Sequence, residues 1–220
     1  MRILTLDAAM AQCSVALVDS GRTIAGRQLA GGRGQSALLA PMVAAVLAEA
    51  GQDPLKLDAV AVTVGPGSFT GLRAALALAH GMGAAGVAVV AVTVAEALAE
   101  AAGALGCRRL WMAIDSRRGR VFLDDGGSLR AVAVSDLRPP EYRLALAGDA
   151  ADAVAEALAA LGADVRVTEA RLPHGPAIAA VGMRRLAGEL PKLSAQPLYV
   201  DPPEASLPAG GLRPAPRPAA

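Results

Sequence analysis

The sequence predicts an α/β protein built from duplicated βββαβα subdomains, the second shorter than the first. Three observations lead to this fold class. Short apolar runs separated by turn residues open each half of the chain, helical periodicity follows them, and each half begins with a strand that ends in an aspartate, Asp7 and Asp115. We expect one subdomain over residues 1–105, a second over 106–200, and a tail over 201–220.

The first half begins with three strands and continues with alternating helices and strands. Strands are expected over residues 2–7, 13–18 and 23–29, because these runs are apolar and the turn signal Asp19-Ser20-Gly21 separates the last two. Such short connections predict an antiparallel meander. The elements that follow are a helix over 36–50, a strand over 59–64, a helix over 70–82, a strand over 87–92 and a helix over 95–105.

The second half repeats this plan. Its expected elements are strands over 110–115, 121–123, 129–134 and 144–147, a helix over 149–161, a strand over 165–168 and a helix over 176–187. The stretch from Pro202 onward is rich in Pro, Ala and Gly and shows no periodicity. We therefore expect a disordered or loosely draped tail.

Composition argues against several classes of site. The net charge of +1 gives no overall electrostatic attraction for nucleic acid, so an RNA contact would need a local patch or a partner protein. Cys13 and Cys107 show no ligand spacing, and His80 and His174 are not paired, so no metal site is expected. The nearly uncharged stretch 74–95 contains several glycines, which favours a buried helix and strand over a membrane span. We expect a cytoplasmic protein.

A glycine-rich loop, residues 64–73 (Val-Gly-Pro-Gly-Ser-Phe-Thr-Gly-Leu-Arg), joins a predicted buried strand to a helix. Glycines there permit positive φ and let backbone amides converge at a helix N-terminus, where an anion such as phosphate can bind. The loop matches neither the P-loop nor the Rossmann fingerprint. The glycines would equally permit a tight turn with close packing, and local physics favours this second interpretation without excluding the first.

The segment from Gly65 to Arg73 resembles the signature of the TsaB family. Other segments resemble that family in order and spacing: Ile3–Asp7, Cys13–Leu17, Leu57–Val62, Ile114–Phe122 and Pro197–Val200. The resemblance spans about residues 2 to 200 and implies the ASKHA (actin-like, RNase H-like) fold. It also implies a non-catalytic subunit of the complex that makes N6-threonylcarbamoyladenosine in tRNA. The implied partners are a TsaD-like catalytic subunit that it binds and activates, a TsaE-like ATPase, and tRNA through the complex.

The same resemblance places the partner surface on the first two helices, here 36–50 and 70–82. The apolar residues at helical spacing on these helices are the candidates: Leu38, Met42, Val46, Leu72, Leu76 and Ala79. The alternative is that they face this chain's own sheet, as apolar helix residues usually do. An isolated chain would pair with itself through the same surface as a homodimer. Polar substitution at Leu38, Met42 or Leu76 would then abolish pairing without unfolding.

Candidate nucleotide or anion contacts are Asp7, Gly65, Gly67, Ser68, Gly71, Arg73 and Asp115. ASKHA enzymes clamp phosphates between strand turns and use acids to hold a metal. However, Ala8 and Ala9 lack the hydroxyls of a phosphate turn, and the family's His-Ser-Glu segment reads Gln35-Ser36-Ala37 here. We expect no catalytic residue and no intrinsic cofactor, and leave open a nucleotide at the partner interface. The alternative is a stand-alone ASKHA nucleotide-binding enzyme, a small kinase or ATPase.

Overall fold

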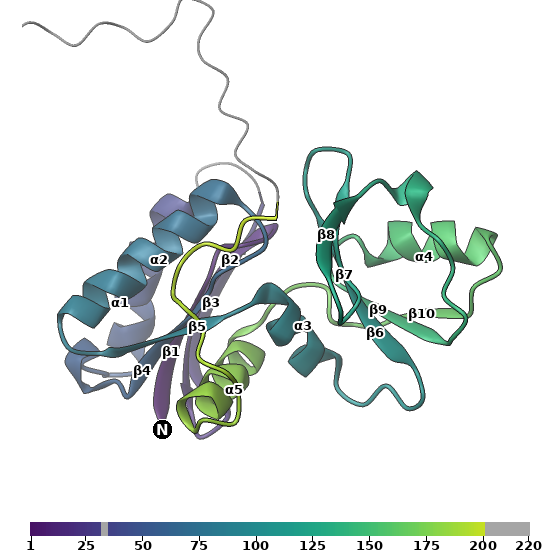
Figure 1. The fold of residues 1–220 in the computed structure, drawn as a ribbon. Helices are drawn as coiled ribbons and strands as arrows, with labels where there is room; N and C mark the ends of the chain where they lie inside the picture. The colour runs from purple at the N-terminus through teal and green to yellow at the C-terminus, as the bar shows by residue number, and fades with distance from the viewer. Residues whose placement is uncertain (32–34, 201–220) are drawn as a thin grey trace, which may run out of the picture.

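The computed structural model describes residues 1–31 and 35–200, which form two five-stranded sheets with helices packed against them (Figure 1). The tail expected over 201–220 lies outside these residues. Within the described part of the chain, no helix has the length and apolar character that a membrane crossing needs. The α/β class predicted from the alternating runs is confirmed.

The first sheet consists of β1 (Arg2–Asp7), β2 (Gln12–Asp19), β3 (Arg22–Ala30), β4 (Ala59–Thr63) and β5 (Ala88–Val92). Its strand order is β3-β2-β1-β4-β5. The pairs β1–β2 and β2–β3 are antiparallel, which is the predicted meander, whereas β1, β4 and β5 run parallel. Leu4 packs on one face of the sheet and Ile3 on the other, so both faces need cover.

The second sheet consists of β6 (Arg109–Asp115), β7 (Val121–Asp124), β8 (Leu129–Val132), β9 (Leu144–Ala147) and β10 (Val165–Val167). Its strand order, β10-β9-β6-β7-β8, is that of the first sheet read from the other edge. Again three strands form an antiparallel meander, and two further strands run parallel to the first of them. Strands β6 to β10 thus correspond to β1 to β5, and the predicted duplication is confirmed.

Helices α1 (Leu39–Glu49) and α2 (Phe69–Ala84) cover one face of the first sheet, and α4 (Ala151–Ala160) covers one face of the second. Three short 3₁₀ turns are η1 (Gln35–Leu38), η2 (Pro54–Lys56) and η3 (Val134–Asp136). The helix expected from residue 36 therefore begins as a 3₁₀ turn, and Pro41 lies in the first turn of α1, where its missing N–H costs little. In the second unit η3 occupies the place of α1, which makes that unit shorter.

The last helix of each unit crosses to the sheet of the other unit (Figure 1). Helix α3 (Val94–Ala102) contacts β6 and β9, and its Leu98 is buried with Ile114 of the second sheet. Helix α5 (Gly175–Leu186) contacts the strands of the first sheet, where Ile178 covers the face that carries Ile3. The chain expected as the second subdomain, 106–200, thus builds the second sheet and then returns to the first.

A buried apolar cluster joins the two units. Ala9, Met10 and Leu72 of the first unit pack with Met112 and Phe122 of the second. The turn after β1 is part of this cluster, since Ala9 is 1% exposed and Met10 6% exposed. The two units are therefore joined by a packed apolar contact beside that turn, and not by the connecting chain alone.

Candidate functional site

The glycine-rich loop lies against the turn that follows β1, backbone to backbone. A Cβ atom at Gly67 would lie 2.0 Å from the carbonyl oxygen of Ala9, and one at Gly71 would lie 1.9 Å from the carbonyl oxygen of Ala8. Both distances are far inside the van der Waals limit, so only glycine fits. The close approach holds the N-terminus of α2 against the end of β1.

Backbone amides of this loop are used within the chain. The N–H of Ser68 donates to the carbonyl of Ala9 at 2.6 Å, and the N–H of Leu72 donates to the carbonyl of Ser68 at 2.9 Å. The Ser68 side chain caps α2 by accepting from the N–H of Gly71 at 3.2 Å. The geometry therefore favours the interpretation that the loop is a tightly packed strand-to-helix turn, not a cradle of free amides.

Asp7, the first of the two strand-ending acids, is fully buried. Its Oδ1 accepts from Thr63 Oγ1 at 2.6 Å and from the N–H of Ala9 at 3.1 Å, whereas its Oδ2 has no hydrogen-bond partner among the described residues. Desolvation by burial raises the pKa of Asp7 to about 6, against the lowering effect of these hydrogen bonds. No group of three acids, cysteines or histidines able to hold a metal occurs in the described chain.

The raised pKa of Asp7 predicts that folding stability falls as the pH rises. The unfolded-state pKa is near 3.8 and the folded-state pKa about 6, so the stabilising contribution is complete below pH 4 and is lost by about pH 6. Two pKa units correspond to about 3 kcal/mol. We expect Asp7→Asn to remove much of this pH dependence and to raise the free energy of unfolding at pH 7.5 by about 1–2 kcal/mol, since its amide stays partly unpaired.

Denaturant unfolding of the parent chain and Asp7→Asn between pH 4 and pH 8 measures this effect. The parent should lose stability between pH 4 and pH 6 relative to the variant. Parallel pH profiles for the two proteins would show that Asp7 is ionised in the fold at little cost, which would contradict the prediction.

Asp115, the second strand-ending acid, lies in a different environment because it is exposed. Its Oδ1 accepts from the N–H of Arg117 at 2.7 Å, and its own N–H donates to Asp149 Oδ1 at 2.8 Å. Burial raises the pKa of Asp149 above its ordinary value. Asp115 therefore shapes the turn between β6 and β7, as a capping acid does.

The six apolar residues expected at the partner surface fall into two groups. Four are at most 4% exposed and belong to the core, which corrects the expectation for them: Val46, Leu72, Leu76 and Ala79. Helical spacing identifies an apolar stripe but not what covers it, and here the chain's own sheet and the second unit do. Leu38 is 44% exposed, and Met42 is half-buried, with its sulfur 3.8 Å from Cys13 Sγ.

The outward side of η1 and α1 carries small residues without charge. Before Glu49, which is itself exposed at the end of α1, the exposed positions are Ala37, Leu38, Ala40, Pro41, Ala44, Ala45 and Ala48. No residue from Gln35 to Ala48 is charged, and Glu49 is the first charged residue that follows. Charged residues normally cover the outward face of a surface helix. A face of this composition is typical of a surface that another protein covers. The uncharged run is visible in the sequence and would have identified this face.

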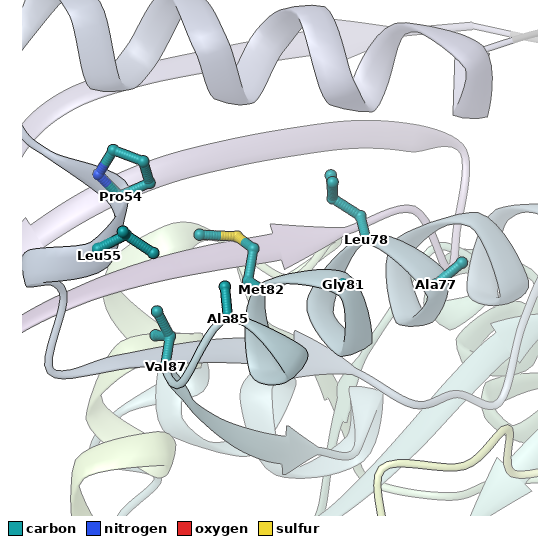
Figure 2. A pocket seen from close by; sticks show the side chains of 8 residues that line it. All are labelled: Pro54, Leu55, Ala77, Leu78, Gly81, Met82, Ala85 and Val87. Carbon is teal, nitrogen blue, oxygen red and sulfur yellow. The ribbon is translucent and has the colours of Figure 1, made fainter.

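A pocket of about 300 Å³ lies beside the C-terminal half of α2 (Figure 2). Figure 2 shows Leu55 of η2 and Met82 of α2 facing a common space, with Val87 below them. The lining is apolar throughout: Pro54, Leu55, Ala77, Leu78, Gly81, Met82, Ala85 and Val87. Leu55 is 63% exposed at its edge. Sequence reasoning missed this pocket because two stretches that lie apart in the sequence, residues 54–55 and 77–87, form it together.

Arg73, which is expected to contact an anion, belongs to an aromatic cluster in the structure. Its guanidinium carbon lies 3.7 Å from the centre of the Phe69 ring, and its Nε donates to Tyr199 Oη at 3.0 Å. The rings of Phe69 and Tyr199 stack with centroids 5.7 Å apart, and both residues are exposed. The glycine-rich loop and the closing segment, residues 195–200, therefore meet on the surface.

Comparisons with known proteins bear on this arrangement. Residues 31–195 match the family model described as "TsaD: tRNA N6-adenosine threonylcarbamoyltransferase". The tRNA threonylcarbamoyladenosine biosynthesis protein TsaB of Escherichia coli (strain K12) is 37% identical over 125 residues, which cover 56% of this chain and 53% of that protein. TsaB of Haemophilus influenzae is 34% identical over 124 residues, covering 56% and 52%. The alignments thus span about half the length of the curated relatives.

Solved structures agree with these sequence matches. YeaZ from Pseudomonas aeruginosa superposes with a TM-score of 0.71 at 27% identity, covering 90% of this chain and 99% of that chain. A protein "with similarity to peptidase YEAZ" from the same organism gives a TM-score of 0.73 at 28% identity, covering 91% and 99%. The chain therefore belongs to the family described by the TsaD model and, within it, to the TsaB proteins, as the glycine-loop signature predicted.

Proposed function

We propose that this chain serves the formation of N6-threonylcarbamoyladenosine in tRNA as a non-catalytic subunit that binds and activates a TsaD-like catalytic partner. Its similarity to proteins named for this biosynthesis supports the process. The proposed assembly also includes a TsaE-like ATPase, and tRNA is reached through the complex.

The uncharged outward face of η1 and α1 is the observation that carries the binding role. Alanine side chains let another backbone approach closely, and no charge has to lose its hydration when this face is covered. Helix α2 packs beside α1, and its pocket at Leu55 and Met82 offers an apolar recess for a partner side chain. In the absence of the partner we expect a second copy to cover this face, giving a homodimer.

The packing around the glycine-rich loop supports a non-catalytic role for this chain. The alternative, a stand-alone ASKHA kinase or ATPase, needs Asp7 and the loop open to a nucleotide. Here Asp7 is fully buried, and Ala8 and Ala9 lie against Gly67 and Gly71 in backbone contact. This arrangement supports the non-catalytic role over the alternative.

Ala44→Glu tests the proposed surface. It places a charge at the exposed middle of α1, where burial against a partner would remove its hydration. We expect binding of the TsaD-like protein from the same genome to weaken at least tenfold, and reconstituted tRNA modification to fall with it, while the thermal midpoint changes little. Affinity is measured by calorimetry and modification by nucleoside analysis.

Ala153→Glu is the matched control, because it adds the same charge to an exposed position of α4 in the second unit. It should leave both readouts at the parent level. Full affinity in Ala44→Glu would place the partner elsewhere on the chain. A parent chain that neither binds the TsaD-like protein nor affects modification would show the proposed function to be wrong.

A further inference from the structure

The cluster of Phe69, Arg73 and Tyr199 places two aromatic rings in solvent in a chain that has only five aromatic residues. Phe69 is 46% exposed and Tyr199 is 42% exposed, whereas Trp111 and Phe122 are buried. An exposed ring forgoes the large stabilisation that its burial would give. This use of scarce aromatic residues needs an explanation.

Holding the closing segment in place does not require the exposed stack. The N–H of Leu198 donates to the carbonyl of Val64 at 2.7 Å, and His80 Nε2 lies 2.9 Å from the carbonyl oxygen of Ala195. Val200 packs against the apolar cluster between the two units. The segment is thus fixed at three points besides Tyr199.

Arg73 retains hydrogen-bonding capacity in this cluster. Its Nε is used by Tyr199, but among the described residues no acid forms an ion pair with it, and α2 contains no acid at all. A guanidinium carries its N–H groups in a planar fork, and the groups of Arg73 that Tyr199 does not use can match a carboxylate. The cluster therefore offers a preorganised cation to an incoming anionic group.

The position of Arg73 links the cluster to the proposed partner surface. Ala77 and Gly81, which line the pocket, follow Arg73 at intervals of four residues, so all three lie along one side of α2. The aromatic cluster, the pocket and the face of α1 thus belong to one side of the first unit. Surfaces that bind single-stranded RNA combine aromatic rings with a basic groove. Here α2 contains no Lys or Arg other than Arg73, so the surface beside the rings is not a basic groove.

We propose, on the basis of the proposed function, that Phe69, Arg73 and Tyr199 form an anchor of the partner interface, at which a carboxylate of the catalytic partner pairs with Arg73 beside the two rings. Tyrosine and arginine are the residue types that dominate binding energy at protein interfaces. The closing segment then belongs to the interface, because it supplies Tyr199.

Arg73→Met tests the anchor while it keeps most of the apolar stem. We expect affinity for the TsaD-like protein to fall about 30-fold or more, and the salt dependence of binding to become weaker than in the parent. Arg73→Lys, which keeps the charge and loses the fork, should bind with intermediate affinity. Arg166→Met is the control, since Arg166 is exposed on β10 of the second unit. Thermal unfolding of each variant checks that it folds.

A photo-crosslinking benzoylphenylalanine at position 199 identifies the occupant in a mixture with the TsaD-like protein and tRNA. We expect a crosslink to the protein. A crosslink to tRNA, or none in a complex that forms, would overturn the proposal, as would parent affinity in Arg73→Met. These results would leave the proposed function standing if the parent binds the TsaD-like protein. A parent that forms no complex would overturn both.

Discussion

Gly71→Ala is expected to destabilise the chain by about 3 kcal/mol or more, although alanine is the better helix former. Helix propensity favours alanine over glycine by about 1 kcal/mol. Against this, the added Cβ would lie 1.9 Å from the carbonyl oxygen of Ala8, a backbone atom that cannot turn away as a flexible side chain can. Overpacking of this kind costs about 1–3 kcal/mol, and more where the backbone has to move. The clash therefore outweighs the propensity.

Gly81→Ala in the same helix is the matched control. A Cβ at Gly81 would meet nothing within 4 Å, so only propensity acts, and the variant should gain up to about 1 kcal/mol. Denaturant unfolding of the two variants beside the parent measures both effects. If both variants were stabilised alike, the backbone contact between the glycine-rich loop and the turn after β1 would not exist in solution.

Arg185→Met should cost about 2–4 kcal/mol, because Arg185 links three elements from a buried position. Its side chain is 7% exposed and forms an ion pair with Glu96 of α3. Its Nη1 donates to the carbonyl of Ala91 at 2.6 Å, and its Nε donates to the carbonyl of Pro191 at 2.8 Å. Methionine fills similar space but leaves a carboxylate and two carbonyls without this donor, and such losses are large when the site is buried.

The adjacent residue provides the comparison. Arg184 is 49% exposed, and its ion pairs with Glu100 and Glu189 are long, at 3.5 Å each. Exposed pairs contribute little, so Arg184→Met should stay within about 0.5 kcal/mol of the parent. Unfolding free energies of the two methionine variants test the contrast. Equal losses would mean that the buried pair of Arg185 does not hold α5 in place.

The strands and helices were largely predictable from the sequence because local periodicity reports them directly. The run from Ala59 to Val62 is apolar at every position, as expected for a strand covered on both faces. The acids Asp7 and Asp115 marked the matching strand ends of the duplication. The crossing of α3 and α5 was not predictable. Apolar periodicity shows that a helix face is buried, and it does not show which sheet buries it.

The candidate site was predictable only where its determinants are local. The glycine-rich loop was identified, and its packing role was one of the two interpretations offered. Arg73 was expected to contact an anion, but its hydrogen bond to Tyr199 could not be predicted, because Tyr199 is 126 positions away in the sequence. Leu76 and Ala79, which were expected at the partner surface, are buried in the chain's own core. The sequence could not show this, because an apolar stripe has the same pattern whether it meets the chain's own sheet or another protein.

The exchange of α3 and α5 has a consequence for how the molecule loses its structure. One face of each sheet is covered by a helix from the other half of the sequence. Unfolding either half would therefore expose apolar surface of the other half to water. Heat or denaturant should therefore unfold the two units together, and different spectroscopic probes should report the same single transition. If the two halves were expressed as separate chains, each would lack the helix that covers one face of its sheet, so neither is expected to fold alone.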